Sequence, residues 1–287
     1  MKTVTELLPV LRRQDRLLNF TRDTVCSLRA SGRSMLGSDR PLPNFLVLGA
    51  QRAGTTSLHQ HLSEHRLIAK PLAKEVQFFT SHYGRGEAWY RAHFPYLQPG
   101  QLTFESSPYY LFQPYVPRRV ATLLPEAKLL VLLREPSARA YSHYLHSRHL
   151  GVENLSFEDA LDAEDARMAE AERLGIESPA GESLHRSFSY KSRGLYAAQL
   201  ERWLEHVSRE QLMVVKSETY LRDPETVVSD VVTFLGLPKG EVQKRANSNV
   251  LASSAGSTLD PSTKQTLTEY FEDDAARLKT MVDVAWQ

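Results

Sequence analysis

The sequence predicts an α/β fold: a single domain with a central parallel β-sheet flanked by helices, preceded by an N-terminal helical extension. Three observations predict this fold. Four short apolar runs have the length of buried strands, segments with helical periodicity separate these runs, and a glycine-containing turn joins the first run to an amphipathic helix. The chain of 287 residues is long enough to bury a sizeable core.

The predicted elements follow one another in a regular order. Residues 4–30 carry leucines at helical spacing, which predicts one or two amphipathic helices, and a polar stretch containing glycine links them to the rest. We therefore expect an extension with its linker over residues 1–40 and the main domain over residues 41–287. The predicted strands cover residues 45–49, 102–106, 128–133 and 212–216. The predicted helices between and after the later strands cover residues 136–149, 156–173, 194–207, 224–235 and 262–284.

The charge balance argues against several classes of partner. The chain has 35 Lys+Arg against 34 Asp+Glu and a net charge of +1, so no global field draws it to nucleic acid or an anionic membrane. The single cysteine, Cys26, excludes an intrachain disulfide. No stretch approaches the ~18 apolar residues of a membrane span or resembles a signal peptide. We therefore expect a cytoplasmic protein without a membrane span, and the sequence leaves its oligomeric state open.

The stretch "GAQRAGTT" after the first strand has the spacing of a phosphate-binding loop. Gly49 lets the chain leave the strand, Gly54 lets the backbone approach a ligand, and two threonines follow as hydroxyl donors. The Lys-Ser/Thr pair of nucleotide-triphosphate loops is replaced by Thr-Thr, and the cation is Arg52 instead. The domain is therefore P-loop-like, although a glycine turn by itself is also a common strand-to-helix connection.

A second candidate anion site lies in "LLREPSARAYSHYLHSR". Arg134 ends an apolar strand, at the edge where open α/β sheets bind ligands, and Ser142 lies about two turns into the next helix. Guanidinium and hydroxyl groups together suit a phosphate. A P-loop NTPase usually has a magnesium-binding carboxylate at the end of such a strand, where this chain has Arg134. Two separate anion sites favour a nucleotide phosphorylated at two places over ATP.

These motifs resemble those of sulfotransferases that use 3′-phosphoadenosine 5′-phosphosulfate (PAPS). The similarity is greatest to the heparan sulfate and glycosaminoglycan branch and its bacterial relatives. The resemblance implies an enzyme that moves a sulfuryl group from PAPS to a hydroxyl or amine of a carbohydrate or other small molecule. It releases adenosine 3′,5′-bisphosphate (PAP) and requires no metal. The segments that carry the resemblance are "GAQRAGTTSL", "KEVQFFTSHYGRGEAWYRAHFP", "RRVATLLPEAKLLVLLREPSARAYSHY", "RGLYAAQLERWL" and "LRDPETVVSDVVTFLGLP".

The resemblance also implies roles for individual residues. Glu75 aligns with the glutamate that relatives use as the general base, and Arg52 takes the place of the loop lysine that stabilises the leaving phosphate. The residues implied at the 5′-phosphosulfate are Gln51, Arg52, Ala53, Gly54, Thr55, Thr56 and Ser57. Those implied at the 3′-phosphate and the adenosine are Arg134, Ser142, Tyr196, Ser254 and Gly256.

The expected acceptor side departs from the family pattern in part. Lys74 and Gln77 flank Glu75 and are expected to orient the acceptor or the sulfate, and Tyr109 is expected to line the acceptor site. Ser106 stands where glycosaminoglycan relatives usually have lysine. The stretch "NVLASSAGSTLDPSTKQTL" keeps the glycine and serines of the family's loop over the nucleotide but lacks its basic residues.

Three histidines follow the second anion site, at positions 143, 146 and 149. Other sulfotransferase branches use a histidine as base, so His146 and His149 are candidates for a further catalytic role, while a helix surface is the alternative. A metal site is disfavoured because no carboxylate lies at short range in the sequence. The remaining alternatives for the whole chain are a P-loop kinase or NTPase and a non-catalytic nucleotide-binding protein.

Overall fold

A computed structural model describes residues 26, 29–33, 39–238, 259–282 and 284–286. Most of the predicted helical extension therefore lies outside the described residues, although residues 29–33 are helical. Residues of the predicted extension contact the main domain: Arg33 Nη1 of this helical segment donates to the Ala92 carbonyl, and Arg40 Nη1 after it donates to the Phe94 carbonyl. Among the described helices, none combines the length and the apolar character needed to cross a bilayer.

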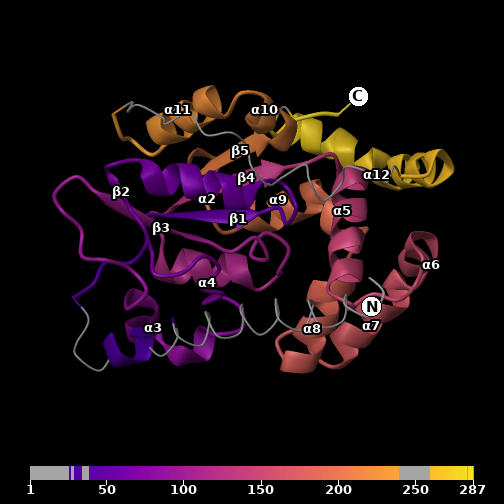
Figure 1. Cartoon of the computed structure of the whole chain (residues 1–287), viewed down its shortest axis with the longest axis horizontal. Helices are drawn as coiled ribbons and strands as arrows, with labels where there is room; N and C mark the ends of the chain where they lie inside the picture. The colour runs from indigo at the N-terminus through magenta and orange to yellow at the C-terminus, as the bar shows by residue number, and fades with distance from the viewer. Residues whose placement is uncertain (1–25, 27–28, 34–38, 239–258, 283, 287) are drawn as a thin grey trace, which may run out of the picture.

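A parallel sheet forms the centre of the molecule (Figure 1). Within the described residues it has five strands in the order β2-β3-β1-β4-β5, and all neighbouring pairs are parallel. Because both faces of such a sheet are covered, its strands are almost continuously apolar. The strands are β1 (Phe45–Gly49), β2 (Ile68–Ala69), β3 (Leu102–Ser106), β4 (Lys128–Leu133) and β5 (Leu212–Lys216). The α/β fold class and the four longer strands are thus confirmed, with the predicted bounds.

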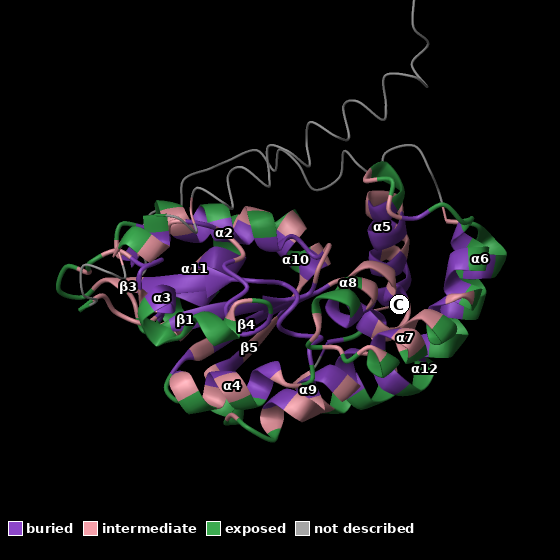
Figure 2. Ribbon diagram, turned by 90° about the horizontal axis from the view of Figure 1, so that it is seen from below, coloured by how far each residue is buried: buried purple, intermediate pink, exposed green. Residues whose placement is uncertain are grey.

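Helices cover both faces of the sheet. Figure 2 shows α2, α10 and α11 on one face and α4 and α9 on the other, while α5, α6, α7 and α8 lie beyond one edge. That edge is the carboxyl edge, because α5 begins directly after β4. The helices are α2 (Thr55–Glu64), α3 (Glu87–Arg91), α4 (Val116–Leu123), α5 (Pro136–His149), α6 (Phe157–Asp162), α7 (Glu164–Arg173), α8 (Pro179–Phe188), α9 (Tyr196–Leu204), α10 (Ser217–Arg222), α11 (Pro224–Phe234) and α12 (Pro261–Val282). Short 3₁₀ turns lie at Tyr83–Arg85, Ser192–Gly194 and Arg209–Gln211.

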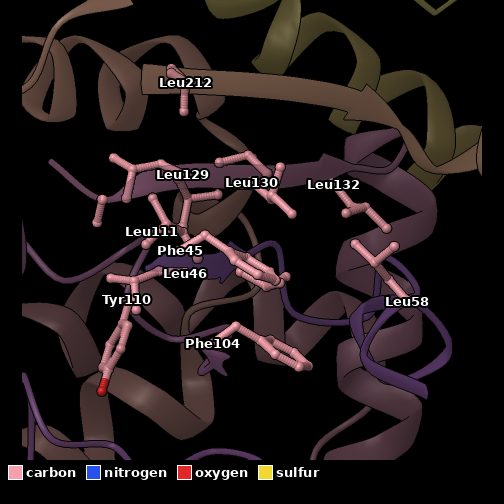
Figure 3. Close-up of a cluster of buried hydrophobic side chains, with 14 of the residues drawn as sticks. Phe45, Leu46, Leu58, Phe104, Tyr110, Leu111, Leu129, Leu130, Leu132 and Leu212 are labelled. Atoms are coloured by element: carbon pink, nitrogen blue, oxygen red, sulfur yellow. The ribbon is translucent and has the colours of Figure 1, made fainter. Parts of the chain in front are cut away.

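The core fills the space between the sheet and these helices (Figure 3). The parallel register of β1 and β3 places Phe45 beside Phe104, and the two rings stack with their centroids 5.0 Å apart. Leu58 of α2 packs over the sheet and is fully buried. This packing holds the β1-to-α2 connection rigidly against the sheet, because close-packed interiors transmit rather than absorb displacement.

One predicted helix is in fact two. The helix expected over residues 156–173 breaks at Ala163 into α6 and α7. Glu164, the first residue after the break, is buried, and its carboxylate accepts hydrogen bonds from the backbone N–H groups of Lys191 and Ser192. The acidic stretch of residues 156–173 is therefore not solvated throughout, since the Glu164 carboxylate holds the chain at Lys191 and Ser192.

Candidate active site

The loop between β1 and α2 has the strand–turn–helix form that its sequence predicts. A Cβ atom at Gly49 would lie 2.8 Å from Leu111 Cβ, so only glycine fits where the chain leaves the strand. Gly54 has a φ of 95° and precedes the first residue of α2. It has no side chain to cap the helix, and the first-turn N–H groups therefore remain available to an anion. Gly54, Thr55 and Thr56 line a cavity of about 520 Å³.

The two predicted anion sites meet in this cavity. Arg52 Nε donates a hydrogen bond of 3.1 Å to Ser142 Oγ of α5, and Arg134 Nη1 donates one of 3.2 Å to the Arg52 carbonyl. Arg52 has a φ of 69°, an uncommon conformation for a residue with a side chain. Burial lowers the pKa of Arg52, and the positive charge of Arg134 lowers it further. Two neighbouring guanidinium groups make this part of the cavity strongly attractive to an anion.

Glu75 enters the same cavity from the segment after β2. Its Oε1 lies 2.5 Å from Lys74 Nζ, and its Oε2 accepts a hydrogen bond of 3.3 Å from Gln77 Nε2 and lies 3.7 Å from Arg186 Nη2. The Glu75 side chain is 36% exposed, so a bound molecule can reach it. Burial acts to raise the pKa of Glu75, but the charge and hydrogen bond of Lys74, with Arg186 and Gln77, outweigh it and hold the pKa below its usual range. The carboxylate is therefore ionised near neutral pH.

The three histidines of α5 differ in position. His143 and His146 line the cavity, whereas His149 is exposed and lies outside the described lining. Burial lowers the pKa of His146 to about 4, and the nearby positive charge of Arg52 adds to the effect. His143 is buried, and its pKa falls well below the usual value, again mainly through burial. Both rings are neutral at neutral pH, and a neutral ring keeps a nitrogen lone pair that can accept a proton or a hydrogen bond.

Tyr109 forms one wall of the cavity through a fixed hydrogen-bond chain. Gln113 Nε2 donates to the Tyr109 hydroxyl, which lies 2.8 Å from His185 Nδ1. Burial lowers the pKa of His185 to about 3, so this ring is neutral. Because the amide fills an acceptor position of the hydroxyl, the hydroxyl hydrogen points to His185 and Nδ1 is the acceptor. Tyr109 is thus held in one orientation.

Arg186 and Arg193 are site residues that the sequence analysis missed. Arg193 is buried, its Nη1 donates to Gln51 Oε1 of the loop, and its guanidinium lies 4.8 Å from the centre of the Tyr109 ring. Burial lowers the pKa of Arg193 to about 9, so it remains charged at neutral pH. Its Nη2 also donates to the Arg186 carbonyl, which ties α8 to the loop. The cluster of basic residues in "HRSFSYKSRG" is the signal that could have revealed both arginines.

The other predicted residues have mixed positions. Ser57 lines the cavity and accepts a hydrogen bond of 3.0 Å from the Tyr220 hydroxyl. Tyr196 is buried, and its hydroxyl donates to the Arg134 carbonyl, so it holds the backbone of the second anion site without lining the cavity. The predicted residues outside the described lining of the cavity are Ala53, Gln77, Ser106, Ser142, His149 and Tyr196, although Ser142 Oγ accepts a hydrogen bond from Arg52 of the lining. Ser254 and Gly256 lie outside the described residues.

The described part of the chain also bears on metal binding. There, no group of three or more His, Cys, Asp or Glu side chains is placed to hold a metal ion. The positive charge that lines the cavity comes from Arg52, Lys74, Arg134, Arg186 and Arg193.

Comparison with known proteins gives consistent matches. The sulfotransferase domain family matches residues 42–268. The mouse bifunctional heparan sulfate N-deacetylase/N-sulfotransferase 4 is 37% identical over 208 residues, which cover 68% of this chain and 22% of that protein. The human heparan sulfate glucosamine 3-O-sulfotransferase 5 is 30% identical over 199 residues, which cover 69% of this chain and 54% of that protein. The chain thus spans about a fifth of the first relative and about half of the second.

Two solved structures share the fold. A sulfotransferase from Alicyclobacillus acidocaldarius aligns with a TM-score of 0.70 and 31% sequence identity, covering 86% of this chain and 98% of that one. A mouse sulfotransferase complexed with PAP aligns with a TM-score of 0.50 and 13% identity, covering 83% of this chain and 86% of that one. With the family match over most of its length and the arrangement of its loop, the chain belongs to the sulfotransferase family.

Proposed function

We propose that this protein transfers the sulfuryl group of PAPS to a hydroxyl or amine acceptor and releases PAP. The hydrogen bond between Arg52 and Ser142 carries this proposal, because it joins the phosphate-binding loop to the second anion site. Both sites open into the cavity that also contains the ionised carboxylate of Glu75. A nucleotide with phosphates at two positions, one of which carries the reacting group, fits this arrangement better than a triphosphate on a single loop.

The residues of the cavity fit PAPS in charge and size. The first turn of α2 offers N–H and hydroxyl groups to the 5′-phosphosulfate, and Arg134 with Ser142 offers a guanidinium and a hydroxyl to the 3′-phosphate. A volume of about 520 Å³ lies in the usual range of ligand sites. The related mouse enzyme that was solved with PAP supports the same choice of nucleotide.

The residues of this chain then have distinct tasks. PAPS, when bound, supplies an activated sulfuryl group. Glu75 takes the proton of the acceptor O–H or N–H while the acceptor atom forms its bond to sulfur and the bond from sulfur to the 5′-phosphate oxygen breaks. Arg52 stabilises the negative charge that grows on that oxygen, and fixed cations already in place cost no reorganisation during the reaction. We expect this to suffice without a metal ion.

The acceptor side of the cavity combines aromatic and cationic groups. The Tyr109 ring, with Arg186 5.4 Å from its centre, faces the region beside Glu75. Aromatic faces and charged groups bind sugars as well as other small polar molecules, so we propose a carbohydrate or another small molecule as acceptor. The names of the relatives, which are heparan sulfate enzymes, support the carbohydrate.

Two experiments test the proposal. In a thermal shift assay, PAP without metal should raise the melting temperature, whereas ATP with Mg²⁺ should not, since a ligand stabilises only the fold that binds it. The reverse result would support a P-loop NTPase. In a transfer assay with labelled PAPS and a panel of acceptors, Glu75→Gln should lower kcat by about 10²- to 10⁴-fold. Glu170→Gln serves as its control, because the Glu170 side chain is 44% exposed and lies outside the described lining of the cavity, and equal activity of both variants would refute the assignment of the base.

A further inference from the structure

Glu105 is a buried carboxylate that the mechanism above does not use. It lies in β3 next to the carboxyl end of the strand, is fully buried and does not belong to the described lining of the cavity. Its Oε1 accepts hydrogen bonds from Ser107 Oγ at 2.6 Å, the Tyr110 hydroxyl at 2.6 Å and the Gln77 backbone N–H at 3.1 Å. Its Oε2 accepts one from the Tyr90 hydroxyl at 2.5 Å. Burying a carboxylate without a cation costs free energy, and hydrogen bonds offset this cost only where each donor is held in place.

The donors that reach Oε1 hold one segment of the backbone. Gln77 N–H bonds to Glu105 directly and lies 3.3 Å from Ser107 Oγ. Phe79 N–H donates to the Tyr110 hydroxyl at 3.1 Å, which leaves the Tyr110 hydrogen free to point to Glu105. The backbone of residues 77–79 is therefore fastened to β3 and the turn after it through this one carboxylate. Tyr90, in contrast, meets only Oε2.

The fastened segment has an unusual backbone. Glu75 has a φ of 62° and Gln77 a φ of 57°, both in the left-handed region. Residues with side chains in such conformations cost of order 1–3 kcal/mol each and persist only where surrounding contacts determine them. Glu75 N–H donates to the Ser106 carbonyl at 3.0 Å, and Gln77 Nε2 donates to Glu75 Oε2 at 3.3 Å. The orientation of the Glu75 carboxylate therefore depends on the position of the Gln77 backbone.

We propose that Glu105 is a positioning residue for the reaction, which holds Gln77 so that the Gln77 amide aims the Glu75 carboxylate into the cavity. This inference rests on the proposed role of Glu75 as base. Glu105 touches neither reactant and acts through Gln77. Its loss should misplace the base rather than weaken nucleotide binding, and a displacement of about 1 Å at a reacting group can cost about 10²-fold in rate.

Glu105→Gln is the first test. The amide keeps the size of the side chain but replaces one acceptor oxygen with an N–H₂ donor, so at least one donor of the cluster loses its acceptor and the others meet a weaker one. We expect kcat to fall about 10- to 100-fold, while the Kd for PAP and the KM for the acceptor change less than about threefold. A folded Glu105→Gln protein with normal kcat would overturn the proposal.

A matched pair of tyrosine variants separates positioning from general stability. Tyr110→Phe removes the group that binds both Oε1 and the Phe79 N–H, whereas Tyr90→Phe removes only the donor to Oε2. Both keep their rings in the aromatic core, where Tyr90 stacks on Phe78 and Tyr110 packs on Phe79. Tyr110→Phe should lower kcat, and Tyr90→Phe should lower the melting temperature but keep kcat. If both variants lost kcat in proportion to their loss of stability, the Glu105 cluster would have only a structural role. The same pair of variants tests the proposal if Glu105→Gln does not fold.

Amide hydrogen exchange provides a readout that does not depend on the identity of the base. Glu105→Gln should speed exchange at Gln77 at least tenfold, because a neutral amide oxygen accepts the Gln77 N–H more weakly than the carboxylate does, and Tyr90→Phe should not. Unchanged exchange at Gln77 would refute the positioning role even if activity fell. If Glu75→Gln left transfer unchanged, the proposed base would be wrong. If Glu75→Gln abolished transfer but Glu105→Gln had a normal kcat, only the role of Glu105 would be refuted.

Discussion

Arg52 Nε and Ser142 Oγ are 3.1 Å apart, although 90 positions separate them in the sequence. The bond links the loop at the carboxyl end of β1 to the helix that follows β4, and these strands are neighbours in the sheet. Adjacent parallel strands bring their carboxyl ends to the same edge of the sheet, so residues that follow the two strands can contact each other there. The positive charge of the loop is therefore oriented by the second anion site.

Replacement of Arg52 tests its role at the leaving oxygen. Arg52→Ala removes the charge that stabilises the leaving phosphate, and we expect kcat to fall about 10²- to 10³-fold at saturating PAPS and acceptor. Arg52→Lys keeps the charge but not the fork geometry, so it should recover part of that loss. Steady-state kinetics of the two variants measure the difference. An Arg52→Ala enzyme with normal kcat and only a raised KM for PAPS would show that Arg52 binds the nucleotide without acting on the transferred group.

Lys74 should control the pH range in which Glu75 works. Glu75 must be ionised to accept a proton, and Lys74 helps to hold its pKa below the usual range. Without Lys74 the pKa of Glu75 rises, so Lys74→Met should move the acid limb of the kcat/KM profile to higher pH. Lys70→Met, which removes an exposed lysine nearby, is the control. If Lys74→Met lowered kcat/KM but left the pH of the acid limb unchanged, the ionisation of Glu75 would not be the cause of that limb.

His146 and His149 form a natural pair of variants on one helix. His146 lines the cavity with a pKa of about 4 and is a neutral acceptor at pH 7, whereas His149 is exposed. His146→Asn should therefore lower kcat or raise the acceptor KM about tenfold, which corresponds to one lost hydrogen bond of ~1.4 kcal/mol. His149→Asn should change neither. Equal activity of both variants at pH 7 would exclude a role for His146.

The strands were predictable from the sequence, whereas several site residues were not. Buried parallel strands appear as continuous apolar runs, and β1, β3, β4 and β5 therefore have the predicted bounds. Strand β2 has two residues and is too short to show a pattern. The helices α4 and α8 were missed because proline and polar residues obscure their periodicity, although both begin with proline in the first turn, a position that suits it.

Buried charges were harder to predict than apolar elements. Glu105 and Arg193 are of residue types that usually lie at the surface, but both are buried here and hydrogen-bonded to distant partners. Arg193 donates to Gln51, 142 positions away, and Glu105 accepts from Gln77, 28 positions away. Such pairings are set by the topology of the sheet and leave no local pattern. Arg52, Arg134 and Ser142 were identified as site candidates from motif spacing, and Glu75 from the family resemblance. The structure places Arg52, Glu75 and Arg134 in the lining of one cavity, and Ser142 bonds to Arg52 beside it.

Buried neutral histidines should make the protein less stable as the pH falls from about 6.5 towards 4. Burial lowers the pKa of His93 to about 4, and that of His185 to about 3, from a usual value near 6.5. In this window the unfolded chain binds protons that the folded chain does not, so the free energy of unfolding is highest above pH 6.5 and declines below it. Each such histidine adds up to about 1.4 kcal/mol per pH unit to this slope. Urea unfolding of His93→Gln at several pH values between 4.5 and 7 should give a slope smaller by that amount. The exposed His206→Gln should keep the slope of the wild type, and an unchanged slope in His93→Gln would mean that His93 titrates normally in the folded protein.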